Sequence, residues 1–344
     1  MPEANLTYPI EPPAMAAWKA VAPGVRWIRL PMPFSLDHIN IWALDDGDGW
    51  ALVDTGVRTD QVVETWDTLL ATEPFDRPLT RIFVTHMHPD HVGMAGWLTR
   101  RFDVQLWITA LEYLSCRALV SDSQREAPPD ALRFYTEAGW PAAAIEKYRT
   151  RFGGFGKLIY TLPDSFHRLQ DGQRLTIGEH EWEVVTGNGH SPEHACLYCA
   201  EQKLLISGDQ VLAKISSNVS VHPIEPEANP MADWLASIEK LKARIPDDVL
   251  VLPAHDNCFR GLHARLKRLH DGQMEAFERL RGALKQPQRV IDVFGSLFSR
   301  PIDASSPNFH LATGETIACL NYLIQQGEVV KEVRDGVAWY RLER

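Results

Sequence analysis

The chain places four side chains that could hold a metal ion within six consecutive positions. These are His86, His88, Asp90 and His91. Imidazole nitrogens and a carboxylate suit a borderline divalent ion such as zinc, and four donors are more than one tetrahedral ion with an open coordination position needs. The spacing therefore predicts a metal centre, with two adjacent ions as one expected form.

The neighbouring residues predict that this cluster lies on a loop between a strand and a helix. Residues 81–85 are mainly β-branched or aromatic, Pro89 interrupts regular structure, and residues 92–101 have helical spacing. One isolated histidine would favour an ordinary surface loop. Here, however, three more candidate ligands follow apolar runs later in the chain: His190, Asp209 and His255.

The order of these residues resembles the pattern of the metallo-β-lactamase superfamily, which is a His-x-His-x-Asp-His loop, a lone histidine, an aspartate and a final histidine. The chain has them in the same order. Asp54, which follows the apolar pair Leu52-Val53, matches an aspartate that the family carries after an early strand. The resemblance covers about the first three quarters of the chain and implies an α+β fold, the αββα sandwich.

The resemblance also implies roles for these residues. One divalent ion would be held by His86, His88 and His190, and a second by Asp90, His91 and His255. The carboxylate of Asp209 would bridge the two ions. Asp90 is expected as the catalytic proton acceptor or as a ligand only. Asp54 would orient a ligand imidazole, with turn capping as its alternative role. The ions are expected to be zinc, with iron or manganese as alternatives.

The reaction implied is hydrolysis, in which a metal-bridging hydroxide attacks the carbonyl of a small-molecule thioester, ester or lactone. Two alternatives use the same fold: a nucleic-acid-processing metallo-phosphodiesterase and an iron-dependent sulfur dioxygenase. Lys214 and Asn218, in the polar run after Asp209, are candidate substrate contacts, although a solvated loop explains them equally well. Asp256-Asn257 replaces the Gly-Pro-like pair common in the family, which puts the shape of that loop in question.

Composition limits the partners. A formal net charge of −10 gives no general attraction to nucleic acid or to an anionic membrane. Neither a signal peptide nor a membrane span is visible, and the five cysteines form no regular framework, so we expect a cytoplasmic protein. Cys196 and Cys199 lie in an apolar run and are expected to be buried thiols.

Two domains are expected from the pattern along the chain. Residues 1–265 would form the metal-binding hydrolase domain, with antiparallel strands over 25–53 and a helical insertion over about 110–160. The insertion carries aromatic residues that could form a lid or pocket wall, or its own small core: Tyr113, Phe134, Tyr135, Trp140, Tyr148 and Phe155.

Residues 266–344 would form a small C-terminal domain. Helices are expected over 260–284, 290–298 and 315–326, and Asp335-Gly336 predicts a hairpin. This order resembles a winged helix, which a branch of the superfamily carries. The helix over 315–326 has no Lys or Arg, and its expected exposed residues are Glu315, Asn321, Gln325 and Gln326. We therefore expect a packing, dimerisation or pocket-closing module, with a homodimer as one assembly, rather than a nucleic-acid reader.

Overall fold

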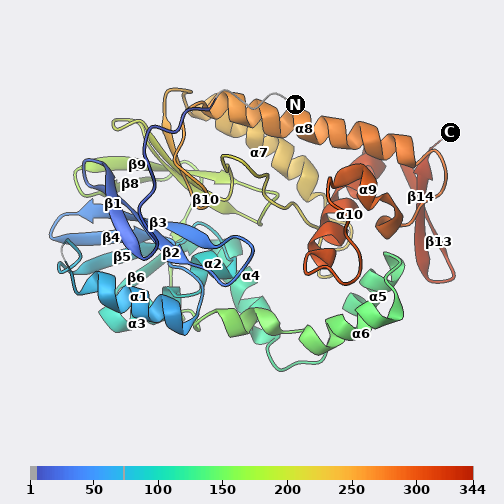
Figure 1. Ribbon diagram of the computed structural model, residues 1–344, viewed down its shortest axis with the longest axis horizontal. Helices are drawn as coiled ribbons and strands as arrows, with labels where there is room; N and C mark the ends of the chain where they lie inside the picture. The colour runs from blue at the N-terminus through green and yellow to red at the C-terminus, as the bar shows by residue number, and fades with distance from the viewer. Residues whose placement is uncertain (1–5, 73, 344) are drawn as a thin grey trace.

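The computed structural model describes residues 6–72 and 74–343, and its central feature is a sandwich of two β-sheets (Figure 1). The first sheet has seven strands in chain order: β1 (Ala17–Ala22), β2 (Val25–Pro31), β3 (His38–Asp46), β4 (Gly49–Val53), β5 (Leu79–Phe83), β6 (Gln105–Thr109) and β7 (His167–Leu169). The second has five strands in the spatial order β12 (Leu250–Pro253), β11 (Leu204–Gly208), β10 (His194–Cys199), β9 (His180–Gly187) and β8 (Arg174–Ile177).

Strand β3 shows why both faces of the first sheet are covered. Ile39, Ile41 and Ala43 belong to the core beneath the outer helices, whereas Trp42 and Leu44 belong to the core between the sheets. Successive side chains of a strand point to opposite faces, so an apolar run of this kind requires cover on both sides. The expected α+β sandwich is confirmed.

Helices supply that cover (Figure 1). The helices α1 (Asp60–Leu70) and α3 (Ala95–Phe102) pack on the first sheet. The helices α7 (Pro230–Arg244) and α8 (Leu262–Ala283) pack on the second sheet. The polar ends of α7 and α8 face solvent, while their apolar faces join one large cluster of buried side chains.

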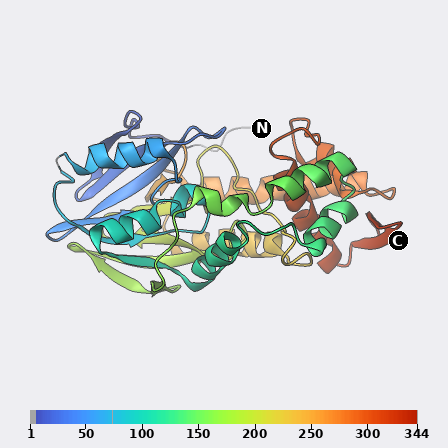
Figure 2. The same cartoon turned by 90° about the horizontal axis from the view of Figure 1, so that it is seen from below.

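The expected insertion lies between β6 and β7 and reaches the same end of the molecule as the C-terminal elements (Figure 2). Its elements are α4 (Ala110–Ser121), α5 (Pro129–Glu137), α6 (Ala142–Arg151) and a 3-10 helix, η1 (Gly154–Leu158). Tyr135 contacts Trp140 and Tyr148, with ring centroids 4.2 Å and 4.6 Å apart. Trp140 also contacts Phe309 at 4.6 Å, so the insertion shares its aromatic core with the C-terminal elements.

Those C-terminal elements end in the expected hairpin. They are η2 (Val290–Val293), α9 (Phe294–Leu297), α10 (Phe309–Gln325), β13 (Val329–Arg334) and β14 (Val337–Leu342). Asp335 and Gly336 have φ of 51° and 77°, as a type I′ turn requires. The single helix expected over 290–298 is wrong in form, since the segment makes a 3-10 turn and one α-helical turn. Its β-branched residues and Gly295 have low helix propensity.

Three further expectations can be placed. The division at residue 265 falls inside α8, and one buried cluster joins the second sheet to the insertion and the C-terminal elements, so the two-domain division stays a prediction. All five cysteines are buried and free, as expected for Cys196 and Cys199. Among the residues described, no helix has the length and apolar character that crossing a bilayer requires.

Candidate metal centre

The candidate ligands follow the ends of four strands. β5 ends at Phe83, and α2 (Pro89–Val92) begins directly after His88. Pro89 therefore occupies the first helical position, where a missing N–H is tolerated and a fixed φ is favourable. The chain thus turns sharply between strand and helix, which explains how a run of six residues can present four donors to one point. The other three candidate ligands come shortly after β9, β11 and β12: His190, Asp209 and His255.

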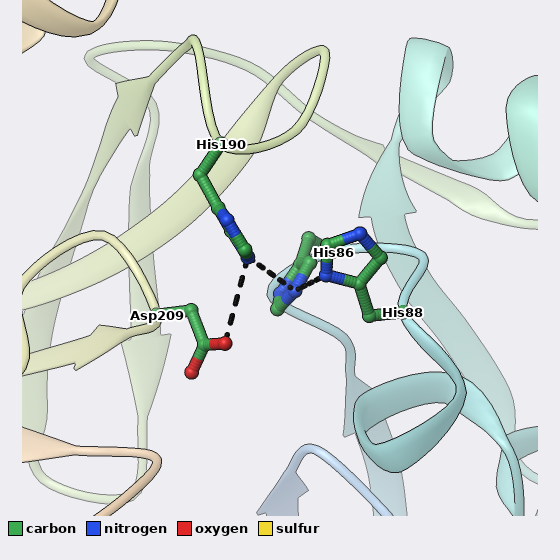
Figure 3. Close-up of side chains that lie close together, drawn as sticks. All are labelled: His86, His88, His190 and Asp209. Carbon is green, nitrogen blue, oxygen red and sulfur yellow. Dashed lines mark hydrogen bonds and ion pairs between the residues drawn. The ribbon is translucent and has the colours of Figure 1, made fainter. Parts of the chain in front are cut away.

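One group of ligands consists of His86, His88, His190 and Asp209, whose donor atoms converge (Figure 3). His86 Nε2 lies 2.8 Å from His88 Nδ1 and 3.3 Å from His190 Nε2. His190 Nε2 lies 3.5 Å from Asp209 Oδ2. The structure therefore brings together three imidazoles and one carboxylate oxygen.

The second group consists of Asp90, His91 and His255. His255 Nε2 lies 3.3 Å from Asp90 Oδ2 and 3.4 Å from Asp209 Oδ1, and His91 Nε2 lies 3.6 Å and 3.5 Å from the same two atoms. Asp209 thus directs one oxygen to each group. All seven residues predicted as ligands from the sequence lie at this centre, and their role as ligands stays a prediction.

These positions fit metal ions. Four ligands at 2.0–2.2 Å around a tetrahedral ion are separated from one another by about 3.4 Å, which is close to the separations in the second group. Two of its atoms, His91 Nε2 and Asp209 Oδ1, are buried without a hydrogen-bond partner among the described residues. Buried polar atoms are rarely left without a partner, so this pair of atoms fits a bound cation.

Asp54 contacts one candidate ligand, and its role in orienting that ligand stays a prediction. Its Oδ2 lies 2.7 Å from His91 Nδ1, which leaves His91 Nε2 facing the second group. Asp54 also accepts hydrogen bonds from the backbone N–H and hydroxyl of Thr85. The residue is 1% exposed and has φ of 66°, a conformation that aspartate tolerates better than most residues. Orienting partners of this kind fix the tautomer of a metal-binding histidine.

Backbone carbonyls orient two other ligands. Asn218 O lies 2.7 Å from His190 Nδ1, and His38 O lies 3.0 Å from His255 Nδ1. In both rings the Nδ1 atom is therefore placed to donate, and Nε2 is left free for the centre. Sequence analysis could not identify these carbonyls, because every residue has one.

Two buried polar residues at the centre were not predicted from the sequence. The Glu112 carboxylate accepts hydrogen bonds from Met87 N, Ser191 Oγ and Glu193 N, so it ties the loop of His86 to the loop of His190. His194 accepts from the backbone N–H of Asp209 at 3.1 Å and stacks on His86. His194 lies four positions after His190, a spacing that could have drawn attention to it; Glu112 has no comparable signal.

Burial and charge set the protonation of the first group. Burial and the imidazole of His91 hold the pKa of His86 well below its ordinary value. Burial and His190 lower the pKa of His88 to about 3. Both rings are therefore neutral at physiological pH, and the neutral imidazole is the form that binds a metal ion.

In the second group of the metal-free protein, the pKa of the imidazole of His255 is raised rather than lowered. Burial opposes the charged form of His255, but Asp209 and Asp90 prevail and raise its pKa to about 9. Burial likewise opposes ionisation of Asp90, but His91 and His255 lower its pKa to about 2. The carboxylates are thus ionised and ready to ligate, whereas the imidazoles must lose a proton first.

The candidate substrate contacts have different surroundings. The Lys214 side chain is 59% exposed, and its Nζ lies 3.7 Å from Asp256 Oδ1 beside His255. The Asn218 amide is instead engaged: it donates to Glu315 Oε2 at 2.7 Å. Asn218 therefore contributes its backbone to the centre rather than a free side chain. The expectation that Glu315 is exposed is wrong, because α10 packs against this segment and Glu315 is half-buried.

The loop after His255 contains the unusual Asp256-Asn257 pair. Asp256 has φ of 66°, a conformation that favours glycine but that aspartate also adopts. Its carbonyl accepts a hydrogen bond from the Asn40 amide at 2.9 Å. The altered residues thus leave His255 in position.

Comparison with known proteins agrees with this geometry. Residues 35–255 match the model of the metallo-beta-lactamase superfamily, and residues 277–343 match a metallo-beta-lactamase-like C-terminal domain. A beta-lactamase domain protein from Burkholderia ambifaria is similar in structure, with a TM-score of 0.89, 37% identity and 98% of each chain covered. The probable metallo-hydrolase YqjP of Bacillus subtilis is 24% identical over 79% of this chain and 84% of that protein. The acyl-coenzyme A thioesterase MBLAC2 of Homo sapiens is 25% identical over 71% of this chain and 82% of that protein.

Proposed function

The chain belongs to the metallo-β-lactamase superfamily, and we propose that it is a binuclear metal-dependent hydrolase of a small-molecule thioester. The observation that carries the proposal is the carboxylate of Asp209. Its Oδ2 faces His190, whereas its Oδ1 faces His91 and His255. A carboxylate shared in this way suits two adjacent cations better than one.

Zinc is the cation that the donor set suits best, and iron or manganese remain alternatives for the same ligands. Two such ions, when bound, would supply the Lewis acidity that ionises water at neutral pH and polarises a carbonyl oxygen. Burial keeps His86 and His88 neutral, and the neighbouring imidazoles keep Asp90 ionised. Hydrogen bonds orient the rings of His91, His190 and His255. Asp90, with a pKa lowered to about 2, holds a proton weakly and is better suited to ligation than to accepting a proton from the nucleophile.

A thioester with an apolar acyl group fits the surroundings of the centre. Phe34 and Leu36 are 46% and 41% exposed on the loop that leads to His38, whose carbonyl holds His255. Ile215, which is 39% exposed, lies on the loop that follows Asp209. Exposed apolar side chains beside a polar centre suit an amphipathic substrate. The thioesterase relative supports a thioester over an ester or lactone.

The structure disfavours a nucleic-acid substrate, the alternative suggested by a winged-helix-like C-terminal domain. α10, the candidate recognition helix, contains no Lys or Arg and is mostly buried. Asn321 donates to the carbonyls of Pro226 and Ala228 rather than facing solvent. A helix with these contacts cannot enter a groove without leaving its own core. We infer that the C-terminal elements are a packing module that supports the metal centre.

The test is hydrolysis by the zinc-loaded protein of a matched panel of thioester, lactone, lactam and phosphodiester substrates. We expect turnover of the thioester that is lost after chelation and restored by zinc. His88→Ala should abolish turnover and lower bound metal, with His263→Ala, on α8, as the control histidine. Full activity of His88→Ala, or preferred cleavage of the phosphodiester, would overturn the proposal.

A further inference from the structure

A cavity of about 240 Å³ lies between the insertion and the C-terminal elements. These two parts lie at the same end of the molecule (Figures 1 and 2). Helix α6 and the first turn of α10 contribute most of its lining. Three aromatic residues line it, namely Trp140, Tyr148 and Phe309. Trp140 and Phe309 are buried and pack on each other, whereas Tyr148 is only partly buried and offers an aromatic surface to a planar group.

The same cavity is lined by two cations. Lys147 and Arg151 are four residues apart on α6, so they lie on one face of the helix. Neither has an acidic partner within ion-pair distance among the residues that the structure describes. Arg149, on the same helix but outside the cavity, pairs with Glu146 at 3.3 Å. In a chain of net charge −10, this arrangement indicates an anionic ligand.

A third polar group, His310, also lines the cavity. It lies on α10 five residues before Glu315, a rise of about 7.5 Å along the helix. Glu315 holds the Asn218 amide, and the Asn218 carbonyl holds the ligand His190. α10 therefore lines the cavity and also contacts the segment that holds His190.

We propose that this cavity binds the phosphate-bearing nucleotide end of a coenzyme A thioester while the acyl carbonyl lies at the metal centre. The proposal rests on the thioesterase function proposed above and names its substrate class. Phosphate groups accept charge-assisted hydrogen bonds from Lys147 and Arg151, and the adenine base stacks on Tyr148. A thioester of glutathione has neither a phosphate group nor a planar base. It would therefore leave both the cations and the aromatic surface of the cavity without a partner.

Steady-state kinetics of two thioesters with the same acyl group test this. One is octanoyl-coenzyme A, and the other is the octanoyl thioester of N-acetylcysteamine, which lacks the phosphates and the base. In the Lys147→Ala/Arg151→Ala variant we expect KM for the coenzyme A thioester to rise roughly tenfold or more, the effect of losing a charge-assisted contact. The truncated thioester should be unaffected. Arg149→Ala is the matched control and should behave like the wild type with both substrates.

Equal KM values of variant and wild type for octanoyl-coenzyme A would overturn the cavity proposal and leave the thioesterase function intact. Should the zinc-loaded wild type hydrolyse neither thioester, the proposed function fails, and calorimetric titration with adenosine 3′,5′-bisphosphate then tests the cavity alone. Binding that disappears in the double variant would support the site. No binding to the wild type would refute it.

Discussion

At the scale of single residues, we predict that Asp54 controls metal affinity through His91 without ligating a metal. Asp54→Asn keeps a side chain that tolerates positive φ but removes the charge that faces His91 Nδ1. Because partners that orient ligands typically contribute 10–100-fold to metal affinity, we expect zinc affinity to fall by about that factor while the fold is retained. Competition with a chelating dye would measure it. Asp248→Asn, on an exposed ion pair with Lys203, is the control, and equal affinity in both variants would contradict the role given to Asp54.

We predict that zinc binding depends on pH through His255. Its pKa of about 9 lies above the ordinary 6.5, because Asp209 and Asp90 outweigh burial. The charged imidazole therefore stabilises the metal-free protein below pH 6.5, and this stability is lost as the pH rises through about 9. Zinc must displace that proton, so zinc affinity should fall as the pH is lowered from about 9 to 6.5.

The proton released can be counted with a pH indicator when zinc is added to the metal-free protein at neutral pH. His255→Ala should release fewer protons than the wild type. Equal release by the two proteins would mean that His255 is already neutral before the metal binds.

The candidate ligands could be predicted to lie together because each follows an apolar run that forms a strand. The groups that hold these side chains in place were less predictable from the sequence. Asn218 acts through its carbonyl, which carries no signature, and Glu112 lies in an ordinary helical pattern. Lys214 and Asn218 illustrate the same limit, since polarity after a strand does not tell a solvated side chain from an engaged one.

At the scale of elements, the contact between α10 and the segment of Asn218 requires a glycine. A Cβ at Gly314 would lie 2.7 Å from Ser220 Cβ and 2.8 Å from the Val221 carbonyl oxygen. Gly314→Ala should therefore destabilise the protein by about 1–3 kcal/mol, because this overpacking outweighs the gain in helix propensity of about 1 kcal/mol.

Urea denaturation gives the measurement, and α8 supplies the matched control. A Cβ at Gly282 meets nothing within 4 Å, so Gly282→Ala should stabilise the protein by up to about 1 kcal/mol. A gain of stability in both variants would show that α10 does not pack closely on this segment.

Glu315 should make this contact sensitive to pH. Burial raises its pKa from 4.5 to about 7, so the folded protein holds a proton that the unfolded chain has lost, and stability declines as the pH rises between these values. Glu315→Gln retains an acceptor for the Asn218 amide but has no charge to bury. Its Tm relative to the wild type should therefore increase from pH 4.5 to above about 7. A difference in Tm between Glu315→Gln and the wild type that stays constant across this pH range would contradict the raised pKa of Glu315.

Element prediction succeeded where local signals are strong. Asp335-Gly336 marked the hairpin, and the ligand loop lay between a strand and a helix as expected. Prediction was less accurate where tertiary packing determines the bounds of an element. α10 begins at Phe309 rather than at residue 315, because Phe309 and Ala312 are buried against neighbouring elements that the sequence pattern does not reveal.

At the scale of the whole molecule, a shared core predicts cooperative unfolding. One buried cluster contains side chains of the second sheet, the insertion and α10, among them Leu205, Phe134 and Leu320. We expect urea to unfold the protein in a single transition, with the same midpoint by circular dichroism and by tryptophan fluorescence. Two separated transitions would instead support independent domains divided near residue 265.

The same core predicts that the C-terminal elements cannot be removed cleanly. A chain that ends at residue 286 would expose the faces of α7 and α8 that pack on α10. We expect it to aggregate or to lose bound zinc, because His190 loses the support that Glu315 gives through Asn218. A soluble truncated protein with unchanged zinc content would show that this support is dispensable.

The central claim is a binuclear centre that hydrolyses a thioester. Its most direct test is elemental analysis of protein purified without added metal, combined with thioester hydrolysis by the same sample. We predict about two zinc ions per chain and activity that declines in proportion to the metal removed by a chelator. About one iron per chain without hydrolysis, or undiminished hydrolysis by the metal-free protein, would contradict it.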